Sequence, residues 1–305
     1  MKMRVIAAVL AATGSVAFGQ GRMIAIDSSR AISEIDIATG AKTLIGTASS
    51  NASTTAGLAY DCATGRLFLS STGNDSLYLL DLTTGNATLV GFYGDSAMVM
   101  HGLEWDNSTG TLYGVSSHNN GLYIINQATG LATLVGTSGL SSFSNLGYNS
   151  DTDTMYSTNS GTDSFYQMNR ANGTVSLIGA LSGPTNPNGL AYNPHDQRLY
   201  LVDNSTDNFY WIDTETGAAN LIGAMGSGNL LGLVYVTNGC PTRCPPCVAD
   251  FNNSGGTPDD ADVSAYFEAW NNGDACADAN GSGGTPDDAD VATFFDLWNA
   301  GGCEG

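Results

Sequence analysis

The chain has 305 residues, with 29 acidic and 9 basic side chains and a formal net charge of −20. Because so few cations cannot neutralise a phosphate backbone, the composition excludes a nucleic-acid-binding protein. Charged residues make up 12% of the chain, and glycines number 39. That balance is typical of many short strands joined by tight turns.

Residues 1–19 have the features of a secretory signal peptide. Lys2 and Arg4 precede an apolar run, and the small-x-small tripeptide Ala17-Phe18-Gly19 predicts cleavage before Gln20. The run is shorter than the roughly 20 residues that cross a bilayer, and no later segment is apolar enough to do so, so we expect no membrane span. The sequence therefore predicts a secreted protein, extracellular or at the cell surface, whose six cysteines form disulfides.

Residues 22–236 contain four short phrases that each recur five times. The clearest ends in Thr-Gly or Asn-Gly, and its last glycines are Gly40, Gly85, Gly130, Gly173 and Gly217. The others resemble TLIG, GLAYD and RLFLS. Apolar alternation bounded by Gly, Asn, Asp and Thr is typical of strands, and four strands in about 44 residues match a β-propeller blade. The pattern predicts twenty strands.

The order of the phrases predicts how the ring closes. The chain enters on the second phrase, at Arg22, and leaves on the first, at residues 232–236. One blade must therefore combine both ends of the domain, which leaves no open sheet edge. We predict an all-β fold, a five-bladed β-propeller with strand-exchange closure over 20–239. The alternative, an open solenoid, would need polar capping units, and none is visible.

The recurrent D-x-x-T-G turns are interpreted as structural elements. Asp accepts backbone N–H bonds at the start of the turn, and Gly supplies a positive φ, so no ligand is needed to explain either residue. These turns share one face of the ring. The variable loops lie on the opposite face, where we expect any ligand.

Four polar residues near the expected central channel are ligand-binding candidates: His101, Glu104, Asn145 and Asn188. His101 and Glu104 occur in only one repeat, and a His with a carboxylate could bind a metal or act as acid and base, which makes them weak catalytic candidates. The alternative is an ordinary hydrogen-bonded pair at a blade junction. Asn145 and Asn188 are partly repeated, as expected of a lectin with one site per blade. The chain contains no G-x-S-x-G, no H-E-x-x-H, no G-x-G-x-x-G before a helix and no P-loop.

After a linker at 240–247, residues 248–305 contain two near-identical units offset by 28 residues. Each begins D-x-N-x-S-G, like the opening of an EF-hand loop, and continues into a helix with one apolar stripe. Each loop has one inserted residue. The predicted ligands of about two calcium ions are Asp250, Asn252, Ser254, Thr257, Asp259 and Asp262, and Asp278, Asn280, Ser282, Thr285, Asp287 and Asp290. A helix cap without metal is the alternative for Thr257 to Asp260, although capping does not explain Asp250 or Asn252.

These tandem loops and helices resemble a dockerin, and the GGTPDDADV form with a final Gly-Gly-Cys resembles the GC-type dockerin-like tails of exported bacterial proteins. The resemblance covers about 247–305. The loops depart from it in having Ser254 and Ser282 where dockerins usually have Asp. It implies a small α-helical anchoring domain with a surface or cohesin-like partner. The propeller resembles secreted repeat propellers only in general terms.

The sequence thus predicts a secreted binding or structural propeller anchored by a calcium-dependent tail. Its ligand would be a glycan or a protein. The alternative is a secreted glycan hydrolase or lactonase that uses channel residues. For the cysteines we expect Cys62 to pair with Cys240, because the closing strand should bring these strand ends together, with Cys244 as another possible partner. In the first pairing, Cys244, Cys247, Cys276 and Cys303 would pair within the tail.

Overall fold

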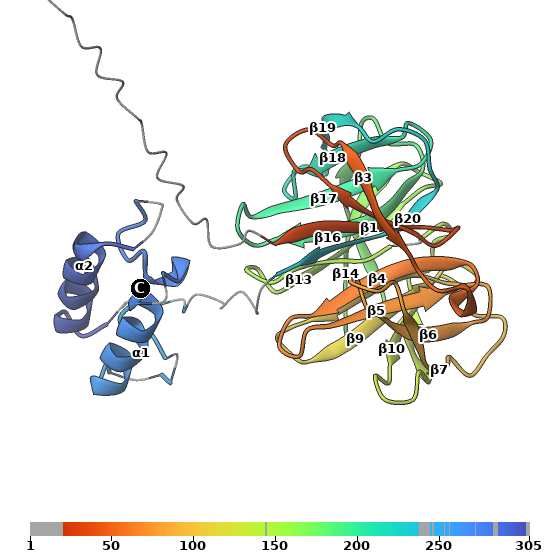
Figure 1. Cartoon of the computed structure of the whole chain (residues 1–305). Helices are drawn as coiled ribbons and strands as arrows, with labels where there is room; N and C mark the ends of the chain where they lie inside the picture. The colour runs from red at the N-terminus through yellow and green to blue at the C-terminus, as the bar shows by residue number, and fades with distance from the viewer. Residues whose placement is uncertain are drawn as a thin grey trace, which may run out of the picture.

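A computed structural model describes residues 21–143, 145–237, 245, 247–252, 254–255, 257–271, 273–282 and 286–302. Twenty strands form five four-stranded antiparallel sheets arranged as the blades of a β-propeller (Figure 1). Two helices follow. The predicted five-bladed propeller with a C-terminal helical segment is confirmed.

Each sheet runs from an innermost to an outermost strand. The first contains β20 (Leu230–Val236), β1 (Arg22–Asp27), β2 (Ala31–Ile35) and β3 (Lys42–Thr47). The second contains β4 (Thr55–Asp61), β5 (Arg66–Ser71), β6 (Ser76–Leu80) and β7 (Ala87–Phe92). The third contains β8 (Met100–Asp106), β9 (Thr111–Ser116), β10 (Gly121–Ile125) and β11 (Ala132–Thr137). The fourth contains β12 (Gly147–Asn149), β13 (Thr154–Asn159), β14 (Ser164–Met168) and β15 (Val175–Ala180). The fifth contains β16 (Pro187–Asn193), β17 (Arg198–Asp203), β18 (Asn208–Ile212) and β19 (Ala219–Ala224). One turn of 3₁₀ helix, η1 (Ser50–Ala52), precedes β4.

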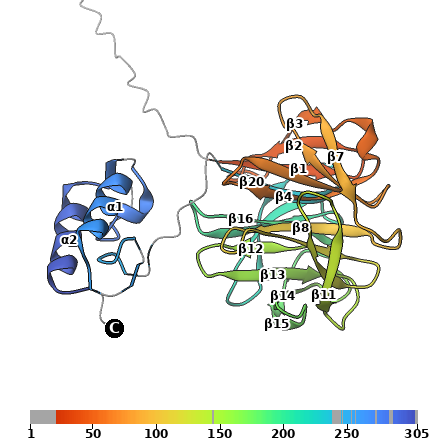
Figure 2. The ribbon, with the colours of Figure 1, turned by 90° about the horizontal axis from the view of Figure 1, so that it is seen from below.

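The ring closes by strand exchange, as the order of the phrases predicts. β20 pairs antiparallel with β1, and Ile24 lies opposite Val234 (Figure 2). Leu233 and Tyr235 of the closing strand are buried. The last strand of the propeller therefore completes the sheet that the first strand begins.

The apolar core of the propeller lies between neighbouring blades. One cluster joins Ile24 and Ile26 of the first sheet to Leu58 and Leu69 of the second. Similar clusters lie at the other interfaces. Each sheet packs against a neighbouring sheet on both of its faces. Apolar side chains are therefore found on both faces of the strands.

In four of the five blades, a glycine of the outermost strand packs closely against a turn of the next blade. An added Cβ at Gly136 would lie 1.9 Å from the carbonyl oxygen of Asn172, just before Gly173. Gly91 has the same relation to Thr129, beside Gly130. The recurrent turn glycines all have positive φ, and the Asp or Asn at the start of each turn accepts backbone N–H bonds. The turn glycines therefore serve turn geometry, as predicted from the sequence, and the glycines of the outermost strands serve blade packing.

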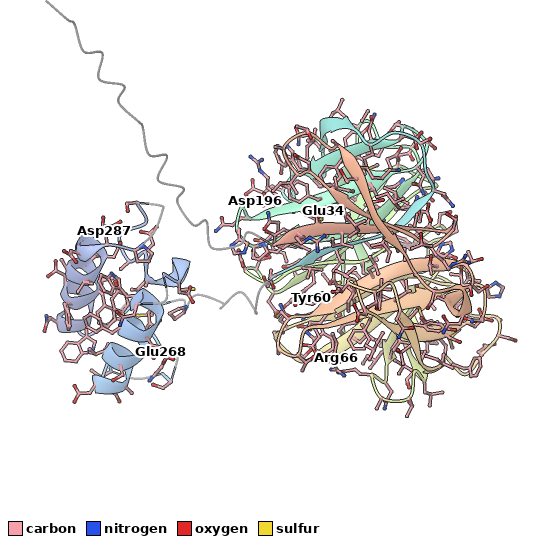
Figure 3. All side chains as sticks on the ribbon, viewed as in Figure 1. Glu34, Tyr60, Arg66, Asp196, Glu268 and Asp287 are labelled. Carbon is pink, nitrogen blue, oxygen red and sulfur yellow. The ribbon has the colours of Figure 1, made fainter. Side chains whose placement is uncertain are left out.

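The tail has two helices of equal length, α1 (Asp260–Asn271) and α2 (Asp288–Asn299), with a 3₁₀ turn η2 (Ala275–Ala277) between them. Tyr266 of α1 stacks on Phe294 of α2 with ring centroids 3.9 Å apart. Both rings are fully buried, as the predicted apolar stripes require. Figure 3 shows Glu268 on α1 and Asp287 at the start of α2. Among the described residues, no helix is long and apolar enough to cross a membrane.

Candidate functional site

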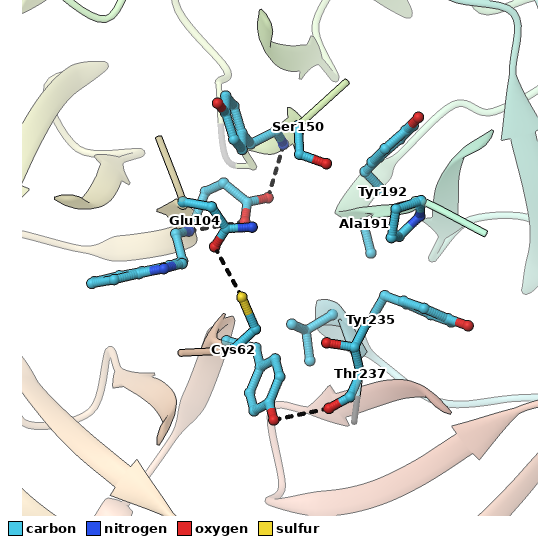
Figure 4. A pocket seen from close by; sticks show the side chains of 13 residues that line it. Cys62, Glu104, Ser150, Ala191, Tyr192, Tyr235 and Thr237 are labelled. Atoms are coloured by element: carbon cyan, nitrogen blue, oxygen red, sulfur yellow. Dashed lines mark hydrogen bonds between the residues drawn. The ribbon is translucent and has the colours of Figure 1, made fainter. Parts of the chain in front are cut away.

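A small cavity lies on the propeller axis, where the innermost strands end. It has a volume of about 60 Å³ and is lined from all five blades (Figure 4). Its lining repeats two equivalent positions of the inner strands and the turns after them. These are Tyr60, Trp105, Tyr148, Tyr192 and Tyr235, and then Cys62, Asn107, Ser150, Pro194 and Thr237.

Glu104 is the carboxylate in this cavity lining. Its Oε1 accepts a hydrogen bond from the backbone N–H of Trp105 at 2.9 Å, and its Oε2 accepts one from the N–H of Tyr148 at 3.0 Å. Burial raises the pKa of Glu104 to about 8, against the lowering effect of these two hydrogen bonds. The side chain therefore links the inner strands of two neighbouring blades.

The inner strands explain why amide groups point toward the axis. Each inner strand pairs with only one neighbour, so alternate N–H groups face away from the ladder. The N–H groups of Trp105 and Tyr148 do so, and both bind Glu104. The equivalent positions in the other blades are Tyr60, Tyr192 and Tyr235. Glu104 is thus a buried carboxyl group whose two oxygens accept hydrogen bonds from two of these inward-pointing N–H groups.

His101 and Glu104 do not form the pair considered from the sequence. Both lie on β8, but a register irregularity falls between Met100 and Gly102, and no hydrogen bond or ion pair joins the two described side chains. Burial alone lowers the pKa of His101. A shared metal or acid–base role has no geometric support in this arrangement.

Asn145 and Asn188 are buried, and their side-chain amides already have protein partners. The Asn145 amide donates to Thr158 Oγ1 at 2.5 Å and to the carbonyl of Asn188, and its Oδ1 accepts from the N–H of Thr158. The Asn188 amide donates to the carbonyl of Asn186 at 2.9 Å. Their observed contacts join segments of the propeller, and a role in ligand binding stays a prediction.

The position and size of the cavity limit its chemistry. It opens on the face of the tight turns, whereas the sequence placed ligand binding on the face of the variable loops. Its volume leaves room for a few water molecules, whereas small-molecule sites usually measure about 300–1,000 Å³. A cavity of this size and position is therefore better suited to holding bound water at the end of the axis than to binding a substrate.

The aromatic positions around the mouth were not among the predicted site residues. They were visible in the sequence, because the GLAYD phrase places Tyr or Trp at its fourth letter in every repeat. The Tyr60 hydroxyl donates to the carbonyl of Thr237 at 3.0 Å, and that of Tyr192 donates to Asp151 at 2.6 Å. These bonds connect neighbouring blades at the turn face.

The first tail loop brings together most of the predicted calcium ligands. Asp250 accepts hydrogen bonds from the N–H groups of Ser254 and Gly255, both at 3.0 Å. Asp262, which is 1% exposed, accepts from the N–H groups of Asn252 at 3.1 Å and Asp259 at 2.8 Å. The carboxylate at the start of the helix therefore holds the start of the loop. Asn252 Oδ1 also accepts from the N–H of Ser254 at 2.8 Å, and Thr257 lies on the exposed surface.

The second loop repeats this arrangement. Asp278 and Asn280 both accept from the N–H of Ser282, and Asp290 accepts from Asn280 at 3.2 Å and Asp287 at 2.8 Å. Its hydrogen bond from the Asp287 N–H is the main factor that lowers the pKa of Asp290, and the Asp278 side chain also lies within hydrogen-bonding reach. Two carboxyl groups that the sequence assigns to one cation therefore lie together. Thr285 lies outside the described residues.

The capping alternative also has support. Asp287 caps α2 and forms a capping box with Asp290, and Asp259 and Asp262 form the matching bonds at α1. No cluster of three His, Cys, Asp or Glu side chains with metal-binding geometry occurs in the part of the chain that the structure describes. A carboxylate has about four lone-pair sites, so these N–H bonds leave acceptor capacity for a cation.

Cys62 lies at the cavity mouth, with its Sγ 3.5 Å from Asn107 Oδ1. No described cysteine is a free thiol. The predicted partners Cys240 and Cys244, and also Cys303, lie outside the described residues, so the pairing of Cys62 stays a prediction. Cys247 and Cys276 belong to the described part of the tail.

Comparison with known proteins supports the fold alone. No protein-family model and no curated protein matches the chain. A chain of a nidogen/laminin complex superposes with a TM-score of 0.53 at 13% identity, over 72% of this chain and 100% of that one. A structural-genomics protein of unknown function from Bacteroides thetaiotaomicron gives a TM-score of 0.52 at 16% identity, over 72% of this chain and 62% of that one.

Proposed function

We propose that this protein is a secreted, non-catalytic binding propeller, held at a surface or in an assembly by a calcium-dependent, dockerin-like tail. The proposal depends on the hydrogen bonds and the surroundings of Glu104. This carboxylate is already bound by two backbone amides in a cavity of about 60 Å³. A ligand such as a glycan or a protein loop would bind on the face of the variable loops, where it needs no enclosed cavity.

A hydrolase or lactonase is the second candidate, and one observation favours it. A carboxyl group with a pKa of about 8 is partly protonated near neutral pH, as a general acid should be. The absence of a contact between His101 and Glu104, and the small volume beside Glu104, argue against this role.

A glycan-array screen of fragment 20–240 separates the two functions, with a parallel assay of turnover on the bound glycans and on lactones. Binding without turnover, unchanged in Glu104→Gln, supports the binding propeller. Turnover that Glu104→Gln abolishes would establish the enzyme and refute the proposal.

For the tail, we infer that each loop binds one calcium ion. The support is the assembly of carboxylate and amide oxygens around Asp250 and Asp262, and its repetition around Asp278 and Asp290. Hard oxygen ligands of this kind suit calcium. The segment 248–305 also contains 12 carboxylates and no Lys or Arg, a repulsion that divalent cations would relieve.

We further infer that a disulfide from Cys62 to Cys240 fixes the end of the closing strand. Cys62 and Thr237 both line the axial cavity, and Thr237 precedes Cys240 by three residues. Non-reducing peptide mapping of the secreted protein tests the pairing. Linkage of Cys62 to Cys276 or Cys303 would contradict it, and linkage to Cys244 would shift the bond without changing its role.

A further inference from the structure

The two tail loops differ in the residue that follows their shared asparagine. Asn252 is followed by Asn253 in the first loop, and Asn280 is followed by Gly281 in the second. An asparagine loses its side-chain amide when the backbone nitrogen of the next residue attacks it, and a following glycine, which has no Cβ, hinders this attack least. The second loop therefore contains the more labile pair.

The hydrogen bonds around Asn280 favour this attack. Its Oδ1 accepts from the N–H of Ser282 at 2.8 Å, so the side chain curls over the intervening residue, Gly281. Attack at Cγ places negative charge on Oδ1, where the same N–H donor stabilises it. The N–H of Gly281 donates only a long hydrogen bond, of 3.3 Å, to the carbonyl of Asp278. Asn280 and Gly281 are both exposed, and beyond the neighbouring residues no atom lies within 4 Å of a Cβ added at Gly281.

The first loop has the same hydrogen bond without the glycine. Asn252 Oδ1 accepts from the N–H of Ser254, also at 2.8 Å, and Asn252 is exposed as well. The two asparagines therefore have matching surroundings, and the following residue is what distinguishes their reactivity. The first loop thus serves as an internal control for the second.

The other Asn-Gly pairs within the described residues are packed into the propeller. They occupy 120–121, 172–173 and 188–189. In all three, a Cβ added to the glycine would lie 2.6–2.9 Å from the nearest atom. Gly121 and Gly189 belong to β10 and β16, and Asn188 is buried. The N–H of Gly173 donates to the carbonyl of Asn169 at 2.8 Å. The propeller therefore restrains these pairs, whereas the second tail loop does not.

We propose that Asn280–Gly281 is a site of spontaneous modification, at which Asn280 is converted to aspartate and to its β-linked isomer. A bond forms between the Gly281 nitrogen and Cγ of Asn280, the bond from Cγ to Nδ2 breaks, and ammonia leaves with the proton of the attacking N–H. Water then opens the cyclic imide. Cleavage of the new bond to Cγ gives aspartate, and cleavage of the bond to the backbone carbonyl gives the β-linked isomer. Water is the only co-reactant.

The modification changes the second loop alone. It adds one negative charge to segment 248–305, which contains 12 carboxylates and no Lys or Arg. The consequence for calcium rests on the proposed function of the tail: aspartate at this third loop position is a good ligand, whereas the β-linked isomer adds a backbone carbon and displaces the ligands that follow it. The tail therefore changes with time from two matching loops to two unequal ones.

Peptide mapping by mass spectrometry, during incubation of the full chain at mildly alkaline pH, tests the proposal. Each conversion shifts the mass of one peptide, because ammonia is exchanged for water. We expect Asn280 to convert about tenfold faster than Asn252, or more. Gly281→Asn, which introduces the residue of the first loop, should slow the conversion of Asn280 to the rate of Asn252. The reciprocal variant Asn253→Gly should accelerate the conversion of Asn252.

Conversion of Asn280 no faster than that of Asn252 would overturn the proposal, as would a Gly281→Asn variant that converts as fast as the wild type. Faster conversion at one of the three propeller pairs would contradict the selectivity of the open loop. The mass readout does not depend on calcium, so a tail that converts at Asn280 but binds no calcium would refute only the proposed function of the tail. Circular dichroism before incubation verifies that each variant is folded.

Discussion

The propeller and the tail are both built from repeats, but different interactions hold the repeats together. In the propeller, five blades bury large apolar clusters between sheets, and strand ladders satisfy most backbone groups. In the described part of the tail, the apolar cluster has three fully buried members, Tyr266, Ala277 and Phe294. Side-chain oxygens of acidic residues hold the tail loops in place.

This difference shows where each part is vulnerable. The stability of the propeller depends on closing the ring, because an open ring would expose two blade interfaces. The stability of the tail depends on carboxylates whose mutual repulsion opposes the folded arrangement. Small domains with small cores usually need a bound metal ion or covalent links such as disulfides to be stable.

The largest effect should come from deleting the closing strand. A fragment of residues 20–229 lacks β20 and exposes the surfaces that Leu233, Val234 and Tyr235 cover. Burying each such side chain contributes about 1.5–3 kcal/mol, and the fragment would also have an open edge. We expect it to aggregate, whereas fragment 20–240 should be soluble with a pure β spectrum by circular dichroism. Equal behaviour of the two fragments would contradict the closure model.

Removing the first carboxylate of both loops should abolish the response of the tail to calcium. In fragment 241–305 we expect Asp250→Ala with Asp278→Ala to eliminate both the heat of calcium binding and the gain of helix, through coupled folding. Glu268→Ala is the control, because Glu268 lies on α1 outside both loops. Calorimetry and circular dichroism with and without chelator measure the effect. A wild-type fragment with unchanged helicity and no binding heat would favour the capping alternative.

The pH dependence of propeller stability should identify Glu104. An acid whose pKa is about 8 in the folded state and 4.5 as an unperturbed side chain stabilises the fold fully below pH 4.5. This contribution is lost as the pH rises toward 8, because the native state then holds a proton that the unfolded state has released. At about 1.4 kcal/mol for each unit of pKa shift, the loss amounts to a few kcal/mol.

Glu104→Gln should remove this slope while leaving the other carboxyl groups in place. The measurement is the free energy of unfolding of fragment 20–240 by urea at a series of pH values. Parallel curves for wild type and variant between pH 4.5 and 8 would show that Glu104 does not titrate as a buried acid.

The repeat made the architecture predictable from sequence, but unique contacts between repeats were not. The phrase order located strand exchange because Arg22 and residues 232–236 belong to consecutive phrases of one blade. Nothing in the sequence linked Glu104 to the N–H of Tyr148, since these residues are 44 positions apart and meet only when neighbouring blades are in place. The Leu and Gly that recur in the TLIG-like phrase could be recognised in the sequence. The exposure of these leucines and the contacts of these glycines with the next blade could be determined only from the structure.

The site candidates show the same limit. The alternation of Asp250, Asn252 and Ser254 indicated converging oxygens, because loop spacing is a local property. Asn145 was selected as a semi-repeated polar residue, and its hydrogen bonds to Thr158 and to the carbonyl of Asn188 depend on two other strands. Local motifs therefore transfer from sequence to structure more reliably than residues that face a channel.

The recurrent glycines of the outermost strands provide an internal control within the propeller. Gly136→Ala should lower the free energy of unfolding by about 1–3 kcal/mol, because its Cβ would lie 1.9 Å from the carbonyl oxygen of Asn172. Gly46 holds the same position in another blade, yet the nearest atom to its added Cβ is Ile32 Cδ1, at 4.0 Å. Gly46→Ala should therefore be neutral or slightly stabilising. Urea unfolding of both variants gives the comparison, and equal costs would refute a specific backbone clash.

The smallest effect concerns the symmetry of the tail. Trp270 Nε1 donates to the carbonyl of Asp287 at 3.1 Å, and Trp298 Nε1 donates to the carbonyl of Asp259 at 3.2 Å. A tryptophan of each helix thereby donates a hydrogen bond to a backbone carbonyl at the start of the other helix. Trp270→Phe and Trp298→Phe should each lower the free energy of unfolding of the tail by about 1 kcal/mol, the usual contribution of one hydrogen bond. Thermal unfolding of fragment 241–305 in calcium measures both, and clearly unequal costs would contradict the reciprocal arrangement, because these contacts are otherwise matched.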